Sequence, residues 1–174
     1  MQRPVACAFV ATSLDGYIAT ESDDLDWLES AGSPNEDYGF QSFLNDVELV
    51  AMGRGTYNYI ASIDPLPYGG RPVEVFTHRP PDPRPGVTFG SWTPGEAATR
   101  WTAKGLGRVY VDGGLLISQF LAAGLIDDLT ITIAPILLGK GRRLFHRADN
   151  TTPLRLSSSK SFPSGMVTLR YQLG

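Results

Sequence analysis

The sequence predicts a single α/β domain of three layers, with a mostly parallel central sheet and an antiparallel hairpin at its C-terminal end. Short apolar runs that resemble strands alternate with helical patterns through the first three quarters of the chain, and only strand patterns follow. Such alternation favours parallel strands joined by helices. A length of 174 residues fits one domain with a sizeable core, and no linker divides residues 1–174.

The composition excludes several classes of protein. The formal charge of −3 comes with no basic stripe, so we expect no nucleic-acid partner and no acidic membrane. The single cysteine, Cys7, allows no internal disulfide and no ordinary structural zinc site, so we expect no metal. No signal peptide and no apolar run long enough to cross a bilayer is present, which predicts a cytoplasmic protein.

The strand patterns are short apolar runs bounded by glycine, proline or polar residues. The first, 5–12, is nearly all apolar, as expected of a central strand covered on both faces. The last two are joined by a short polar loop and predict the hairpin. The expected strands are 5–12, 17–19, 48–52, 72–77, 87–89, 109–111, 129–136, 154–159 and 166–173.

Helix signals lie between these strands. The run Ser33-Pro34-Asn35-Glu36 matches a capping box and predicts a helix whose apolar stripe continues to residue 47. Residues 57–61 predict a short helix. Thr93-Pro94-Gly95-Glu96 is a second capping box, with a helix to Lys104, and another helix pattern runs from residue 115 to Gly124. Residues 20–26 and 64–71 read as surface loops.

Three strand patterns end in residues that suit a phosphate ligand. The carboxyl ends of parallel strands meet at one edge of a sheet, where loops bind ligands. Arginines and helix N-termini together suit a pyrophosphate, and Arg79 beside Thr77 suits a ribose 2′-phosphate, which would select NADP over NAD. The residues at these strand ends are Gly53, Arg54, Thr56, Thr77, His78, Arg79, Asp112, Gly113 and Gly114.

Each of these groups also has an ordinary structural explanation. Arg54 fits a surface charge, His78-Arg79 a solvated turn, and Gly113-Gly114 a tight turn between a strand and a helix. Their shared position at strand ends favours the joint functional interpretation. The sequence has no G-x-x-x-x-G-K-[ST] loop, no G-x-G-x-x-G after the first strand and no G-x-S-x-G elbow.

Two families share these motifs. MGRGTY at 52–57 resembles the phosphate-binding turn of dihydrofolate reductases. The DGG, GLID and APILLGKG motifs of 108–141, with SLDGYIA at 13–19, resemble the C-terminal reductase domain of the bifunctional riboflavin-biosynthesis deaminase–reductase. The resemblance covers nearly the whole chain in order. The zinc-binding motifs of the deaminase are absent, so the chain resembles the reductase domain standing alone.

The resemblance implies a dihydrofolate reductase-like fold and NADPH as cofactor. It implies that Gly53, Arg54 and Thr56 bind cofactor phosphate, and that Thr77, His78 and Arg79 flank the 2′-phosphate. It places Gly113 and Gly114, which follow the cofactor candidate Asp112, against the pyrophosphate and nicotinamide, Ala11 near the nicotinamide, and Asp15 in the substrate pocket. Relatives of the riboflavin type pair through the C-terminal part of the sheet, so the resemblance also implies a homodimer.

The proton donor is a separate question. Asp24-Leu25-Asp26-Trp27 fits the D-L-x-W context in which dihydrofolate reductases carry their catalytic carboxylate. Asp15, Asp24 and Asp26 are therefore catalytic candidates, and Trp27 is a candidate pocket wall. A solvated acidic loop explains the aspartates equally well, and Trp27 equally fits a core anchor.

The expected function is an NADPH-dependent reductase resembling 5-amino-6-(5-phosphoribosylamino)uracil reductase, acting on a small heterocyclic or ribosylamino substrate. Two alternatives stay open. One is a true dihydrofolate reductase, and the other is a dimeric nucleotide-binding module without catalysis.

Overall fold

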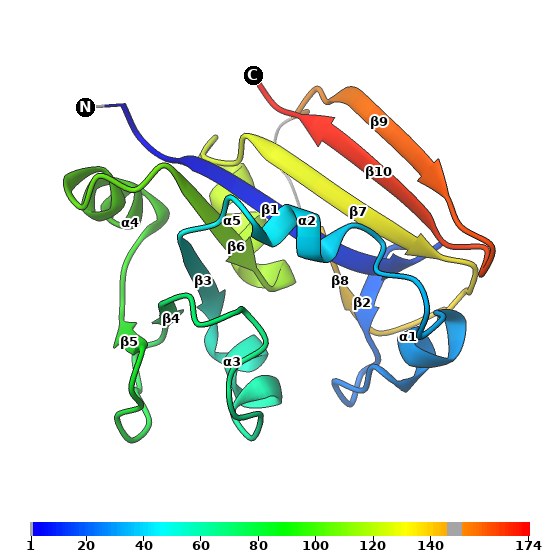
Figure 1. The fold of residues 1–174 in the computed structure, drawn as a ribbon, viewed down its shortest axis with the longest axis horizontal. Helices are drawn as coiled ribbons and strands as arrows, with labels where there is room; N and C mark the ends of the chain where they lie inside the picture. Colours follow the sequence, from blue (N-terminus) through cyan, green and yellow to red (C-terminus); the bar gives the residue numbers. More distant parts are fainter. Residues whose placement is uncertain (1, 146–150) are drawn as a thin grey trace.

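The computed structural model describes residues 2–145 and 151–174. Among these residues an eight-stranded sheet has the order β5-β4-β3-β6-β1-β7-β10-β9, and β2 pairs with β8 in a small second sheet (Figure 1). The strands are β1 (Val5–Ser13), β2 (Tyr17–Ala19), β3 (Leu49–Gly53), β4 (Val73–Phe76), β5 (Val87–Gly90), β6 (Arg108–Asp112), β7 (Asp128–Ala134), β8 (Arg142–Arg143), β9 (Arg155–Ser161) and β10 (Val167–Gln172).

Helices cover both faces of the main sheet. The helices are α1 (Asp26–Ala31), α2 (Phe40–Leu44), α3 (Arg54–Ile60), α4 (Pro94–Ala103) and α5 (Gly114–Ala122). In Figure 1, α2 lies in front of the sheet and α5 lies behind it. Trp101 of α4 and Ile117 of α5 belong to one core cluster, whereas Leu44 of α2 and Ile60 of α3 belong to the other. The predicted three-layer α/β architecture is therefore confirmed.

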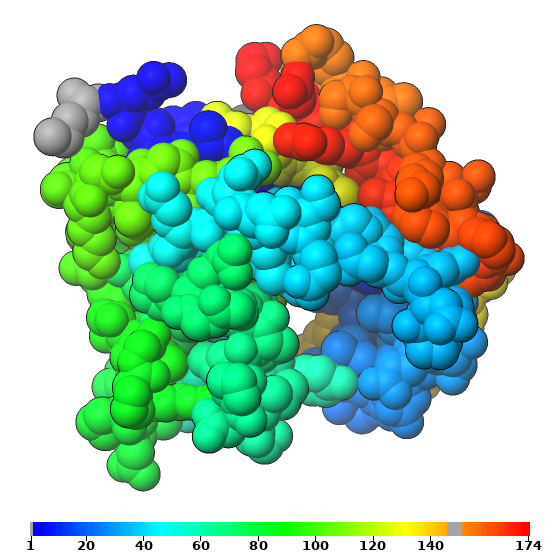
Figure 2. Space-filling model, viewed as in Figure 1, coloured from blue at the N-terminus to red at the C-terminus, as the bar shows by residue number. Residues whose placement is uncertain are grey.

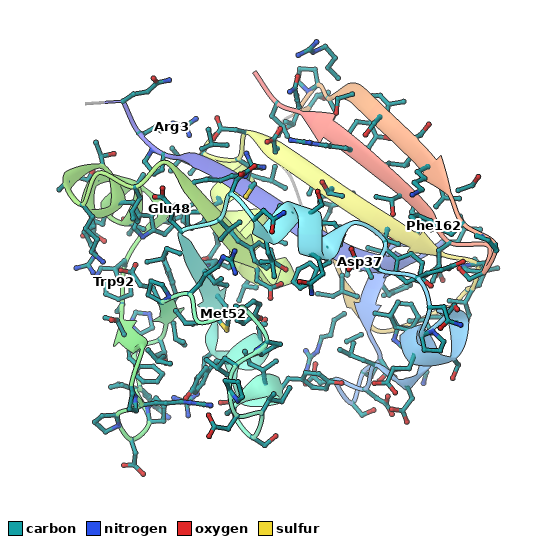
Figure 3. All side chains as sticks on the ribbon, viewed as in Figure 1. Arg3, Asp37, Glu48, Met52, Trp92 and Phe162 are labelled. Carbon is teal, nitrogen blue, oxygen red and sulfur yellow. The ribbon has the colours of Figure 1, made fainter. Side chains whose placement is uncertain are left out.

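The strands follow the two-residue alternation that gives a sheet two covered faces. In β3, Leu49 and Ala51 face the α4–α5 layer, whereas Val50 and Met52 face the α2–α3 layer. Figure 3 shows Met52 near the carboxyl end of β3, with Glu48 at the opposite end of the strand. Strands buried on both sides read as continuous apolar runs, which is why the sequence predicted them well.

The pairing is parallel from β5 to β7 and antiparallel beyond it. β1 pairs in parallel with β6 on one side and with β7 on the other. β10 then runs antiparallel to both β7 and β9, so the predicted C-terminal hairpin is confirmed. None of the helices in the described part of the chain is long and apolar enough to cross a membrane.

The second predicted capping box forms, but the first does not. Thr93 and Glu96 exchange both hydrogen bonds at the start of α4. The helix predicted after Ser33-Pro34-Asn35-Glu36 exists only in part, because α2 begins at Phe40 and ends at Leu44, so the predicted start is wrong. The Glu36 carboxylate instead accepts a hydrogen bond from the Ser164 hydroxyl at 2.5 Å, so a tertiary contact takes the group that the capping box needed.

Two short elements were not predicted. Helix α1 begins at Asp26, at the end of the segment read as a loop, and carries Trp27 into a small core beside Met166. The residues of β8 carry no strand signal of their own, and they pair with β2 in antiparallel fashion. Both elements depend on contacts with distant parts of the chain, which local patterns do not contain.

The connections leaving β1 and β6 pass over opposite faces of the sheet. The chain leaving β1 passes through β2 and α1 to α2, which packs on one face, whereas β6 is followed directly by α5, which packs on the other. In open α/β sheets a crevice forms at such a switch point, outside the carboxyl ends of the strands. The fold therefore places its crevice between the ends of β6 and β1, which are paired neighbours.

A buried charge cluster attaches α4 to β4. The Glu74 carboxylate is 1% exposed and accepts hydrogen bonds from Trp101 Nε1 at 2.9 Å and Lys104 Nζ at 2.5 Å. Arg100 Nη2 lies 3.4 Å from the same carboxylate. Burial by itself raises the pKa of Glu74, but hydrogen bonds and charge from Lys104, Trp101 and Arg100 outweigh it and leave the pKa lowered.

We expect Glu74→Gln to lower the free energy of unfolding by about 2 kcal/mol at neutral pH, since a buried charged hydrogen-bond network loses its acceptor charge. Because the folded pKa is depressed, this stabilisation is present above the unfolded pKa and is lost as pH falls through the folded pKa. Urea denaturation of both proteins at pH 7 and at pH 3 measures the difference.

The matched control is Glu29→Gln, which removes an exposed carboxylate on α1. We expect this change to leave the urea midpoint nearly unaltered at either pH. Equal midpoints for Glu74→Gln and wild type at pH 7 would contradict a stabilising role for the cluster.

Candidate functional site

A pocket of about 450 Å³ lies at the carboxyl ends of β3 and β4. It is lined by Arg54, Asn58, Thr77, His78 and Arg79. Four of these residues are among those that the sequence predicted for the phosphates of a cofactor. The fold therefore brings together two predicted groups that lie more than twenty positions apart in the chain.

Arg54 joins α3 to the loop that follows β4. Its Nε donates to Asn58 Oδ1 at 2.7 Å, and its Nη1 donates to the carbonyl of Arg79 at 2.5 Å. Thr77 Oγ1 accepts from the Arg79 amide at 3.1 Å and closes the turn. The Arg79 guanidinium has no hydrogen bond or ion pair with any residue that the structure describes, so this cation remains available to an anionic ligand.

The turn after β6 approaches α3 so closely that it tolerates no side chain. Gly113 has φ +90°, and a Cβ at this position would lie 2.4 Å from Thr56 Oγ1. A Cβ on Gly114 would lie 2.6 Å from Ile18 Cδ1. Thr56 and Gly113, which the sequence assigned to separate strand ends, are therefore in direct contact, and Gly113 leaves the backbone without a side chain at the N-terminus of α5.

Asp112 lies beside these glycines and is half-buried. Its Oδ1 accepts from the Gly113 amide at 2.8 Å, and its Oδ2 accepts from the Tyr68 hydroxyl at 3.1 Å. Burial raises the pKa of Asp112, and the nearby Tyr110 and Tyr68 hydroxyls and the Gly113 amide only partly oppose that effect. A carboxyl of this kind binds its proton more tightly than an ordinary aspartate does.

Asp15 fixes one loop to another. Its Oδ1 accepts from Ser13 Oγ at 2.6 Å and from the Leu138 amide at 3.1 Å, and its Oδ2 accepts from the Gly139 amide at 2.7 Å. These hydrogen bonds, that of Ser13 above all, lower the pKa of Asp15 to about 2. Asp15 is thus ionised at neutral pH, which does not suit a proton donor, and its place in the substrate pocket stays a prediction.

Asp24 and Asp26 lie at the start of α1 and are exposed. Asp24 Oδ1 accepts from the Asp26 amide at 2.6 Å, so Asp24 turns the chain into the helix. Trp27 is 8% exposed, and its Nε1 has no hydrogen-bond partner among the described residues. The structure therefore gives Trp27 a core position, while a substrate contact through its indole nitrogen stays a prediction.

The acidic loop before α1 is paired with the basic segment around β8. Asp23 accepts from Arg142 Nε at 2.8 Å, and Glu21 lies 2.9 Å from Lys140 Nζ. All four side chains are largely exposed, so each ion pair contributes little to stability. These contacts, with those of Asp15, attach the residues after β1 to the residues after β7.

Figure 2 shows an opening on the molecular surface between the α3 segment and the β2–α1 segment, with α2 along its upper border. Ala11 lies on β1 opposite Thr132 of β7, on the same side of the strand as Phe9, which packs in the α2–α3 layer. The predicted nicotinamide-side residue therefore faces the layer in which the opening lies.

The residues present fit a dinucleotide phosphate cofactor. The fit depends on an available guanidinium at Arg79, on the half-buried Gly113, whose backbone carries no side chain, and on the N-terminus of the nine-residue helix α5. Within the described residues, no three His, Cys, Asp or Glu side chains gather in a way that could bind a metal ion.

Sequence reasoning missed two residues of this site. Asn58 lines the pocket and orients Arg54, and Tyr68 donates to Asp112. Asn58 follows Arg54 by one helical turn, so the spacing could have suggested the contact. Tyr68 lies in a proline- and glycine-rich loop 44 positions from Asp112, and no local pattern links the two.

The comparisons with known proteins agree with this geometry. The chain matches the model of the RibD C-terminal domain over residues 93–168. The uncharacterized protein YwjB of Bacillus subtilis (strain 168) is 36% identical over 171 residues, which cover 94% of each chain. Both matches include the strand-to-helix turn that carries Gly113.

Two solved structures share the fold. The "Putative riboflavin biosynthesis protein" from Shewanella sp. PV-4 superposes with a TM-score of 0.89 at 34% identity, covering 98% of this chain and 99% of that one. Dihydrofolate reductase from Enterococcus faecalis, complexed with NADP(H), gives a TM-score of 0.67 at 17% identity, covering 98% and 96%. At that identity the second likeness shows the fold alone.

We expect Gly113→Ala to lower the free energy of unfolding by about 3 kcal/mol, because the new methyl group meets Thr56 and the residue is strained at positive φ. Gly124→Ala is the matched control, since Gly124 has φ +65° with no atom within 4 Å of an added Cβ. We expect about 1 kcal/mol for this control. Thermal or urea unfolding measures both, and equal losses would show that the contact with Thr56 is unimportant.

Proposed function

The chain belongs to the RibD C-terminal domain family, and from that premise we propose that it is an NADPH-dependent reductase. In this proposal a hydride is transferred to a small heterocyclic or ribosylamino substrate, as in the 5-amino-6-(5-phosphoribosylamino)uracil reductase that the sequence resembles. Family membership and the dihydrofolate reductase-like fold support a reductase activity. The choice of NADPH and of the substrate class is our proposal.

The observation that carries the proposal is the convergence of Arg79, Thr56 and Gly113 at one edge of the sheet. Arg79 offers an available cation at the end of β4, and Gly113 offers bare backbone at the start of α5, on the far side of Thr56. In our proposal Arg79 binds the 2′-phosphate, and the α5 N-terminus faces the pyrophosphate. The solved relative that binds NADP(H) supports this cofactor by its fold.

The chain's own residues bind and orient the reactants. The chemistry that NADPH supplies when bound is hydride donation from its nicotinamide ring. Arg54 keeps the loop after β4 in place, Thr56 packs on Gly113, and the methyl group of Ala11 leaves room on β1 for a flat ring. Asp15 secures the loop that borders the opening on its other side.

We also propose that the protein forms a homodimer through the outer face of the C-terminal hairpin. Every residue of β9 is exposed, and the face contains Leu156, which is 52% exposed and lies opposite Tyr171 of β10. Leu169 shares that face of β10 and is only partly buried. An exposed apolar sheet face of this kind is typical of a protein–protein interface.

We expect Arg79→Ala to weaken NADPH binding by roughly 10- to 100-fold and NADH binding far less, since a charge-assisted contact with the 2′-phosphate is lost. Titration of each cofactor into purified protein, followed by nicotinamide fluorescence, measures both dissociation constants. NADPH oxidation is then assayed with 5-amino-6-(5-phosphoribosylamino)uracil and, separately, with dihydrofolate, which distinguishes the proposed reductase from a dihydrofolate reductase.

The control for this experiment is Arg155→Ala, because Arg155 is an exposed arginine of β9, remote from the pocket. We expect it to leave both dissociation constants unchanged. If Arg79→Ala weakens the binding of NADPH and of NADH equally, Arg79 does not bind the 2′-phosphate. Failure of the wild-type protein to bind NADPH at high micromolar concentration would remove the proposed cofactor.

We expect Leu156→Glu to convert the dimer to a monomer, because a charge buried in an apolar interface is costly. The molar mass from size-exclusion chromatography with light scattering measures the change. Leu137→Glu serves as control, since Leu137 is 69% exposed and lies outside the hairpin. A wild-type protein with the molar mass of a monomer would contradict the proposed dimer and would leave the cofactor proposal unaffected.

A further inference from the structure

The turn of the C-terminal hairpin is bonded to the segment that joins α1 to α2. The Glu36 carboxylate accepts from the Ser164 hydroxyl at 2.5 Å and from the Ser164 amide at 3.3 Å. The Tyr38 hydroxyl lies 3.3 Å from the same Ser164 oxygen, and the rings of Tyr38 and Phe162 meet edge to face with centroids 4.9 Å apart. Tyr38 and Ser164 are 126 positions apart, so only the tertiary fold brings these groups together.

The hydroxyl groups at this contact form one continuous chain of hydrogen bonds. The Ser164 hydroxyl, more than any other group, lowers the pKa of Glu36, so the carboxylate is ionised at neutral pH and can only accept. Because Ser164 gives its proton to Glu36, the Tyr38 hydroxyl donates to Ser164. The Tyr38 oxygen in turn accepts from the Ser33 amide at 2.7 Å. A change at Ser164 therefore affects the whole turn before α2.

Tyr38 has a backbone conformation that depends on these contacts. Its φ of +54° lies in the left-handed region, which is unfavourable for a residue with a side chain. Such conformations persist only where the surrounding structure holds them, and they are frequent at binding sites. The preceding Asp37 accepts from the Gln41 amide at 3.2 Å in the first turn of α2. The contacts of Tyr38 therefore set the direction in which the chain enters α2.

The part of the chain that is fixed in this way borders the surface opening. Helices α1 and α2 lie along two sides of the opening (Figure 2), and Figure 3 shows Phe162 at the hairpin turn and Asp37 in the facing segment. Trp27 of α1 packs in one core with Met166, which follows the hairpin turn. Phe40 of α2 packs on Phe9 of β1, with ring centroids 5.3 Å apart. The pocket at the ends of β3 and β4 is lined by other residues.

We propose that Glu36, Tyr38 and Ser164 are positioning residues, which hold α1 and α2 in the arrangement that binds the substrate. This inference rests on the proposed function, because it assigns this side of the opening to the substrate. Without these contacts α1 and α2 occupy other arrangements for part of the time, and the apparent substrate affinity falls with the competent fraction. The complex is the same once it has formed, so the expected sign is a higher KM with an unchanged kcat.

The first test is hydrogen exchange followed by mass spectrometry, which needs no substrate. In Ser164→Ala we expect peptides from residues 26–44 to exchange about fivefold faster, because Glu36 and Tyr38 lose their partner. Peptides from residues 49–60, which contain β3 and α3, should exchange at the wild-type rate. Ser164→Thr keeps a hydroxyl group and should restore slow exchange.

The second test is kinetic, with NADPH and 5-amino-6-(5-phosphoribosylamino)uracil as the probe. We expect Ser164→Ala and Tyr38→Phe each to raise the KM for the probe by about 5- to 10-fold and to leave kcat within about twofold of wild type. The Kd for NADPH, read by fluorescence, should stay unchanged, and Ser164→Thr should restore the KM. The matched control is Ser158→Ala, which removes the hydroxyl of an exposed serine in β9 and should behave as wild type in both tests.

The outcomes separate this proposal from the proposed function. Unchanged exchange of residues 26–44 in Ser164→Ala overturns the positioning role, and so does an unchanged KM. A fall in kcat without a change in KM overturns it as well. A wild-type protein that binds no NADPH, or that leaves the probe unreduced, would remove the proposed function and with it the substrate role. The exchange experiment would still show whether the hairpin turn holds α1 and α2.

Discussion

The parallel register of β3, β6 and β1 is the constraint on which the site depends. Because these strands pair side by side and in one direction, their carboxyl ends meet at a single edge. The turns after β3 and β6 are then forced so close that Gly113 must lack a side chain where Thr56 approaches it. The same packing leaves the backbone at Gly113 without a side chain at the N-terminus of α5, which is a suitable place for an anion.

Much of the fold could be predicted from the sequence because strands covered on both faces are apolar over their whole length. The capping box at Thr93 formed because nothing else competes for Glu96. The identical pattern at Ser33 failed because Glu36 binds Ser164, a residue of the C-terminal hairpin. A local sequence pattern contains no information about a distant hydrogen-bond partner. A helix start whose capping group binds such a partner therefore cannot be predicted from the neighbouring residues alone.

For the candidate site, likewise, the sequence predicted which residues would gather but not what each of them does. The residue types at the strand ends were visible in the sequence, and the rule that parallel strands end together was enough to group Arg54 with Arg79. Their roles were not visible, because a role depends on what surrounds the side chain. Asp15 looked like a reactive carboxylate, yet two amides and a hydroxyl from neighbouring turns bind it as an anion.

The distribution of cations among the acidic residues shows which carboxylates hold the fold together. The chain has 18 acidic and 15 basic residues, so cations are not scarce overall. They nevertheless gather at Glu74, Asp128 and the loop before α1, where they attach α4 to β4, β7 to β6 and β10, and β8 to that loop. Among the described residues, Asp112 has neutral donors only. The cations therefore mark the carboxylates that attach one element to another, whereas an amide and a hydroxyl hold Asp112 at the turn that leads into α5.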